Sequence, residues 1–215
     1  MTKPLLWISL AASILYFATQ PWHPFTGSVA LKGLCIAPLA LLAWRTLPGR
    51  DGLLLGLALA CGSLGDVLID WRAALFPAAL GAFLIGHFIY IALFWRNRPK
   101  PSRLDPLEKS LIAALCLFAV VMSVYLLPAT GPLAPAVAMY MGALTGMVIS
   151  AVALRLPERW VMAGALLFLV SDTVLAISKF MAPVPGREWI IWPAYYAGQL
   201  FIAAGFLRSR GVRIP

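Results

Sequence analysis

GLLLGLALACGSLGDVLI, residues 52 to 69, is an apolar segment with one carboxylate near its end, Asp66. A helix needs about 20 mostly apolar residues to cross the hydrocarbon core of a bilayer. Lipid permits only helices and closed barrels to span it, and barrel strands would show short segments of alternating polarity, which are absent here. We therefore interpret this segment as a membrane-spanning helix.

Seven further apolar runs of similar length divide the rest of the chain. Of its 215 residues, 62% are hydrophobic and 12% charged, whereas soluble domains are about half apolar and a quarter charged. We predict an all-α membrane protein with eight transmembrane helices in a single integral membrane domain, residues 1–215, with a retained first helix. The other runs are Leu5–Gln20, Thr26–Trp44, Ala74–Trp95, Leu107–Leu127, Leu133–Leu154, Arg159–Ser178 and Glu188–Leu207.

Basic residues are distributed unevenly between the predicted connections. With both termini in the cytoplasm, thirteen of the 17 basic residues fall in cytoplasmic segments and three, Arg72, Lys179 and Arg187, on the opposite side, while Lys32 lies within a helix. This asymmetry is typical of multi-pass proteins and predicts a bacterial-type inner (cell) membrane. It explains the net charge of +9 without nucleic acid, and no protein partner is evident.

The cysteines and histidines do not form a metal-binding pattern. Cys35, Cys61 and Cys116 each lie in an apolar run with no CxxC pair, so we interpret them as small buried hydrophobic residues. Two histidines, far apart in depth, do not suit a zinc hydrolase centre. We expect neither a metal nor another cofactor.

The two halves of the chain resemble each other. The basic proline turns Arg45–Arg50 and Arg155–Arg159 each lead into a helix that ends in a polar motif, Ser63–Leu68 in one half and Ser171–Leu175 in the other. Four helices are an even number, so such repeats would run in the same sense. The pattern predicts two parallel four-helix repeats, residues 1–95 and 107–208.

Ionisable groups inside hydrocarbon are functional candidates, because each costs at least about 2.5–3.5 kcal/mol at the centre of a helix. Asp66 and Asp172 both fall roughly 20 Å from the cytoplasmic ends of their predicted helices, and we favour a functional role for both. Together with five further polar groups they make a set of seven from five helices, which is expected to converge on one outward-facing cavity. The other members of this set are Lys32, His87, Tyr195, Tyr196 and Gln199.

Lys32, His87 and Asp70 each have a structural alternative. Lys32 is either part of the site or a simple counter-ion of Asp66 or Asp172. His87 fits a packing role and a catalytic role equally well. Asp70 fits a solvated helix cap at the membrane surface better than a site residue.

Tyrosines and serines near the predicted cavity also have structural alternatives. Tyr195 and Tyr196 fit an aromatic belt at the membrane surface at least as well as a site. Ser63 and Ser171 are expected to bond back to their own helices, although both remain supporting candidates.

Five segments resemble the YhhN-type family of membrane proteins, which includes the lysoplasmalogenases. They are Lys32, Gly62–Leu68, Gly86–Tyr90, Ser171–Leu175 and Tyr195–Gln199, and the predicted helix count is the same. The resemblance implies a hydrolase that cleaves the vinyl-ether bond of lysoplasmalogens, releasing a fatty aldehyde and a glycerophospho-base. Carried over by position, Asp66 and Asp172 would be the catalytic acids.

This chemistry suits two carboxyl groups. A vinyl ether is cleaved by protonating its β-carbon, which requires one protonated acid, and a carboxylate then stabilises the oxocarbenium ion and activates water. Lys32 would keep the second acid ionised or bind the phosphate. The expected partners are a lysophospholipid substrate and membrane lipids. The alternatives are a small carrier or receptor for a lipid or solute with an outward-facing polar cavity, and a purely structural role for the buried charges.

Overall fold

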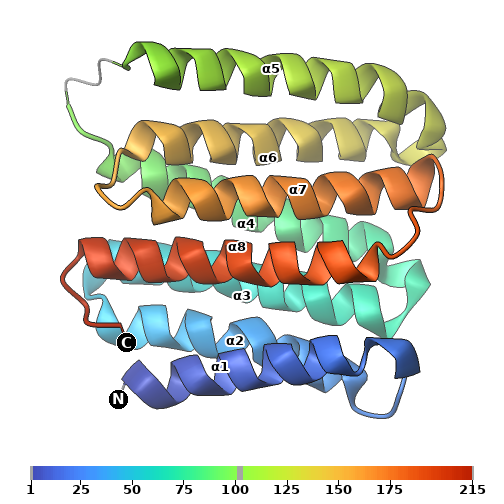
Figure 1. Cartoon of the computed structure of the whole chain (residues 1–215), viewed down its shortest axis with the longest axis horizontal. Coiled ribbons are helices and arrows are strands. Elements are labelled where there is room, and N and C mark those ends of the chain that lie inside the picture. Colours follow the sequence, from blue (N-terminus) through green and yellow to red (C-terminus); the bar gives the residue numbers. More distant parts are fainter. Residues whose placement is uncertain (1, 101–103, 215) are drawn as a thin grey trace.

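Eight α-helices, each antiparallel to the next, form one bundle in the computed structural model, which describes residues 2–100 and 104–214 (Figure 1). Short 3-10 turns join several of them. The helices are α1 (Thr2–Ala18), α2 (Ser28–Thr46), α3 (Gly49–Trp71), α4 (Phe76–Asn97), α5 (Pro106–Leu126), α6 (Ala134–Leu154), α7 (Trp160–Phe180) and α8 (Glu188–Ser209). The predicted helical runs are confirmed to within a few residues at each end.

Length and composition make this a multi-pass membrane protein. Within the described part of the chain, α2 to α8 are each long and apolar enough to cross a bilayer, and α1 is a shorter apolar helix of 17 residues. Because the helix number is even, both ends of the chain lie at the same end of the bundle, which we call the inner end (Figure 1). The opposite end, where α1 leads into α2, is the outer end.

The helices pack mainly with their neighbours in the chain. Helices α1 to α4 follow one another, α4 then packs against α6, and α7 pairs with α8, which returns to contact α1 and α2. Helix α5 lies at the edge of the bundle beside α6 (Figure 1). It buries only Glu108, Leu115 and Leu126 among its residues, so most of its apolar surface is available to lipid.

Glycines bring α7 and α8 into backbone contact. A Cβ atom on Gly198 would lie 2.9 Å from the carbonyl oxygen of Gly164, and one on Gly164 would lie 2.6 Å from the carbonyl oxygen of Gly198. Small residues permit this close approach between membrane helices, whose association depends on van der Waals packing. The pairing fixes the relative positions of two helices that carry polar groups.

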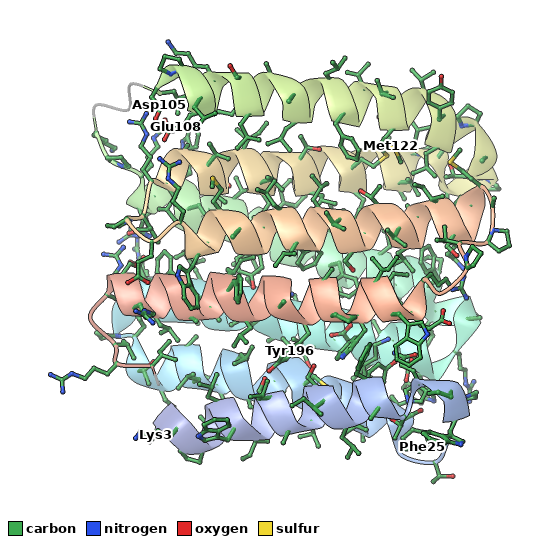
Figure 2. The ribbon with its side chains drawn as sticks, viewed as in Figure 1. Lys3, Phe25, Asp105, Glu108, Met122 and Tyr196 are labelled. Atoms are coloured by element: carbon green, nitrogen blue, oxygen red, sulfur yellow. The ribbon has the colours of Figure 1, made fainter. Side chains whose placement is uncertain are left out.

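A buried carboxylate holds the inner end of α5. Asp105 and Glu108 form a capping box, with the Glu108 amide donating to Asp105 at 2.8 Å and the Asp105 amide donating to Glu108 at 3.0 Å. Glu108 also pairs with Arg155, at the end of α6, and lies 3.8 Å from Arg159. Figure 2 shows both acidic residues at this end of α5. The cluster joins α5 to the connection between α6 and α7.

The three cysteines differ in their surroundings. Cys35 is buried, Cys61 is half-buried and Cys116 is exposed on α5. The prediction of a buried residue is therefore wrong for Cys116, because the apolar run that contains it faces outward from the bundle.

Candidate functional site

A cavity of about 140 Å³ lies within the bundle and is lined by side chains from α2 to α8. Asp66 is five residues from the outer end of α3 and Asp172 is eight residues from the outer end of α7, about 8 Å and about 12 Å at 1.5 Å per residue. Both carboxyl groups thus face one space in the outer half of the bundle. The predicted residues that line it are Lys32, Asp66, Ser171, Asp172 and Tyr195.

Asp66 is held by a tyrosine of α8. The Tyr195 hydroxyl donates to Oδ2 of Asp66 at 2.7 Å, and Asp66 is only 4% exposed. Gln199 donates to the Tyr195 oxygen at 3.4 Å and accepts from Tyr90 at 2.6 Å. Tyr195 and Gln199 therefore lie in the interior and support Asp66, which places Tyr195 in the site rather than in an aromatic belt.

A glycine makes room for this chain of hydrogen bonds. A Cβ atom on Gly62 would lie 2.7 Å from Nε2 of Gln199 and 3.2 Å from the Tyr195 hydroxyl. Gly62 precedes Asp66 by one turn on the same face of α3. The Gly-Ser-Leu-Gly-Asp segment thus combines an acid with the space its partners need.

Asp172 is held by a second tyrosine, which the sequence analysis did not single out. The Tyr140 hydroxyl of α6 donates to Oδ2 of Asp172, and both residues line the cavity. Tyr140 lies in the apolar run Leu133–Leu154. It is six residues from the outer end of α6, and Asp172 is eight residues from the outer end of α7. This similar depth is the signal that would have identified Tyr140.

Lys32 does not pair with either of these two carboxyl groups. Its ammonium lies 3.3 Å from Oδ1 of Asp70 and near the rings of Tyr16 and Trp192, 5.3 and 5.8 Å from their centroids. Asp70 also accepts from the Tyr16 hydroxyl at 3.0 Å. Lys32 is therefore the counter-ion of Asp70, which lies one turn beyond Asp66 on α3, and of neither Asp66 nor Asp172. The expectation of a solvated cap at Asp70 is wrong, because its carboxylate accepts from Lys32 and Tyr16.

The two serines bond to neighbouring helices and not to their own. Ser63 donates to the Gly33 carbonyl of α2 at 3.0 Å, and Ser171 donates to the Ile191 carbonyl of α8 at 3.0 Å. The expected bonds within the helix are therefore wrong. Each serine instead fixes the helix that carries an aspartate against its neighbour.

His87 and Tyr196 lie outside the lining of the cavity. His87 is buried, with its ring 5.0 Å from the rings of Tyr140 and Phe168, and neither of its nitrogens has a hydrogen-bond partner among the described residues. Tyr196 shares a 2.9 Å hydrogen bond with Ser9 of α1 and is labelled in Figure 2. Both are packing residues around the site in this structure, and Tyr196 is not in a surface belt.

The rest of the cavity wall is largely apolar. An apolar arm between α5, α6 and α7 is formed by Phe118, Met122, Leu144, Leu169 and Phe180, and Figure 2 shows Met122 on the side of α5 that faces α6. The arrangement joins two carboxyl groups to a space suited to a hydrocarbon chain. No cluster of three histidine, cysteine or acidic residues within the described ranges is close enough to hold a metal ion.

Comparison with known proteins identifies relatives over most of the chain. A model of the YhhN family matches residues 27–206, which include every residue that lines the cavity. The chain is 31% identical over 220 residues to a lysoplasmalogenase of Mycobacterium bovis, covering 96% of this chain and 83% of that protein. It is 33% identical over 182 residues to lysoplasmalogenase TMEM86B of Homo sapiens, covering 83% and 75%. The rat TMEM86B (Rattus norvegicus) is 30% identical over 211 residues, covering 95% and 84%. No solved structure matches the chain.

Proposed function

This chain belongs to the YhhN family, and from that premise we propose that it hydrolyses the vinyl-ether bond of lysoplasmalogen-type lysophospholipids. The products are a fatty aldehyde and a glycerophospho-base. Relatives named lysoplasmalogenase support the reaction class. The residue assignment rests on one observation. Two carboxyl groups line the same apolar cavity, and each accepts a hydrogen bond from a tyrosine.

Asp66 and Asp172 divide the proton transfers between them. One carboxyl group, in its protonated form, gives its proton to the β-carbon of the vinyl ether, which leaves an oxocarbenium ion. The other, as a carboxylate, stabilises this cation and removes a proton from the water that adds to it. The resulting hemiacetal collapses to aldehyde and alcohol. Two acids in a low-dielectric space favour this division, because both cannot readily ionise together.

The tyrosines set the orientation of the two acids. Tyr195 and Tyr140 each donate to one carboxyl oxygen, which leaves the other oxygen free for substrate or water. The apolar arm would hold the alkenyl chain, because burial of each methylene is worth about 0.8 kcal/mol.

Product analysis tests the function directly. Purified protein is incubated with a lysoplasmalogen and, separately, with the ester lysophospholipid of the same head group and chain length. We expect free aldehyde from the first and no free fatty acid from the second. Fatty acid release would indicate an esterase, and the absence of both products would favour a carrier or receptor.

Replacing either tyrosine by phenylalanine should slow the reaction without unfolding the protein. Hydrogen bonds to charged groups contribute about 1.5–3 kcal/mol, so Tyr195→Phe and Tyr140→Phe are each expected to lower kcat by about tenfold or more. The matched control is Tyr125→Phe on the exposed side of α5, which should retain full activity. Unchanged kcat in both site variants would remove the tyrosines from the mechanism.

We also propose that the inner end of the bundle is cytoplasmic, in a bacterial-type inner membrane. The excess of basic residues at this end supports that orientation and places the cavity on the opposite side. An alkaline phosphatase fused to the carboxyl terminus should be inactive, since alkaline phosphatase is active only outside the cytoplasm. High phosphatase activity would reverse the assignment.

A further inference from the structure

A second, more polar pocket opens at the outer end of the bundle. It has a volume of about 580 Å³ and lies between the segment that joins α1 to α2 and the start of α8. We call it the vestibule. Among its lining residues are Tyr16, His23, Arg187, Glu188 and Trp189.

The vestibule and the cavity share a wall. Lys32, Ile191 and Trp192 line both spaces, so the two adjoin at these side chains. In a lysophospholipid, only the glycerol backbone separates the vinyl-ether oxygen from the phosphate. A lipid whose ether bond lies beside the aspartates would therefore bring its phosphate to this wall.

The charges of the vestibule match a zwitterionic head group. Lys32 is nine-tenths buried at the shared wall, and the exposed Arg187 lies at the rim, where it donates to Ser178 at 2.7 Å with one of its nitrogens and keeps other N–H groups for a ligand. Burial lowers the pKa of His23 below its ordinary value. The cationic groups of the vestibule are therefore Lys32, which also pairs with Asp70, and Arg187. Glu188 and the ring of Trp189 supply partners for an ammonium group.

We propose that the vestibule is the head-group subsite, in which Lys32 and Arg187 bind the phosphate while Glu188 and Trp189 accept the ammonium of an ethanolamine or choline group. The assignment rests on the proposed function for the class of ligand. In this arrangement the bond is cleaved in the cavity and the head group is selected in the vestibule.

Another lysine offers a competing position for the phosphate. Lys179 lines the cavity from the outer end of α7, and its ammonium lies 4.3 Å from the centroid of the Phe76 ring. It does not line the vestibule. Arg187 and Lys179 are both exposed, so replacing either one should leave folding intact. The two variants can therefore be compared directly for ligand binding.

Binding of uncleavable ligands tests the subsite independently of hydrolysis. The probes are a 1-O-alkyl lysophospholipid, whose saturated ether resists the reaction, and the 1-O-alkylglycerol of equal chain length, which lacks the phosphate. Arg187→Gln is expected to weaken binding of the phospholipid by about tenfold and to leave binding of the alkylglycerol unchanged. Lys179→Gln, which tests the competing position, is expected to cause no selective loss of the phospholipid relative to the alkylglycerol.

Three outcomes would overturn the subsite. They are equal loss of both ligands in Arg187→Gln, selective loss of the phospholipid in Lys179→Gln, and wild-type protein that binds the two probes equally. A wild-type protein that releases no aldehyde yet shows the expected binding pattern would contradict the proposed reaction and retain the subsite. The two proposals can therefore fail separately.

Discussion

Asp66→Asn and Asp172→Asn are each expected to lower aldehyde release by about a hundredfold to ten-thousandfold, the range that general acid–base groups contribute. The amide keeps the size of the side chain and still accepts a hydrogen bond from Tyr195 or Tyr140. It can neither give up a proton at neutral pH nor carry the negative charge that stabilises an oxocarbenium ion. The rate of aldehyde release from purified variants, at equal amounts of folded protein, measures the effect.

Asp51→Asn is the matched control for these variants. Asp51 lies on the same helix as Asp66 but at its inner end, where it pairs with Arg96 at 3.2 Å and Arg210 at 3.0 Å. This substitution should leave the reaction rate within about twofold of the wild type, since exposed ion pairs contribute about 0–1 kcal/mol. Full activity in either Asp66→Asn or Asp172→Asn would remove that aspartate from the mechanism.

Combining the two substitutions adds a further test. If the acids act in one reaction sequence, removing the second after the first should cost much less than it does in the wild type, because groups that act as a unit are strongly non-additive. Losses that multiply fully would indicate that the two carboxyl groups act on separate steps or in separate sites.

The helical architecture could be predicted almost completely, for a physical reason. Hydrocarbon imposes a single backbone solution on each long apolar run, so Gly52–Ile69 becomes part of α3 and Glu188–Leu207 part of α8 without any knowledge of packing. Polar and proline-rich breaks then mark the ends. The Glu108 cluster with Arg155 could not be predicted in the same way, because those residues meet only after α5 and α6 have paired.

The polar interior was predictable by residue and depth but not by partner. Asp66 and Asp172 were identified because ionisable groups in lipid are costly, and both line the cavity. Asp66 and Asp70 are one turn apart on the same face of α3, so the sequence alone does not decide which of them Lys32 pairs with. Tyr140 was missed because one hydroxyl in an apolar run carries little cost until its neighbour is known. The internal repeat of four helices remains a prediction.

Gly198→Ala is expected to destabilise the protein by about 1–3 kcal/mol, the usual cost of overpacking. The added methyl group would lie 2.9 Å from the Gly164 carbonyl and 3.0 Å from the amide nitrogen of Phe168. These are backbone atoms, so α7 and α8 must move apart, whereas a flexible side chain would simply rotate away. Thermal unfolding in detergent should show a midpoint several degrees below that of the wild type.

Gly142→Ala provides the comparison, since a Cβ atom there would meet no heavy atom within 4 Å. Alanine has the higher helix propensity, and this variant should be as stable as the wild type or slightly more stable. A Gly198→Ala protein with unchanged stability would show that the α7–α8 interface is looser than the structure indicates.

Because α7 carries Asp172 and α8 carries Tyr195, which supports Asp66, separation of the two helices would also move Asp172 relative to Tyr195. The hydrolysis rate at a temperature well below unfolding should therefore fall in Gly198→Ala and remain unchanged in Gly142→Ala.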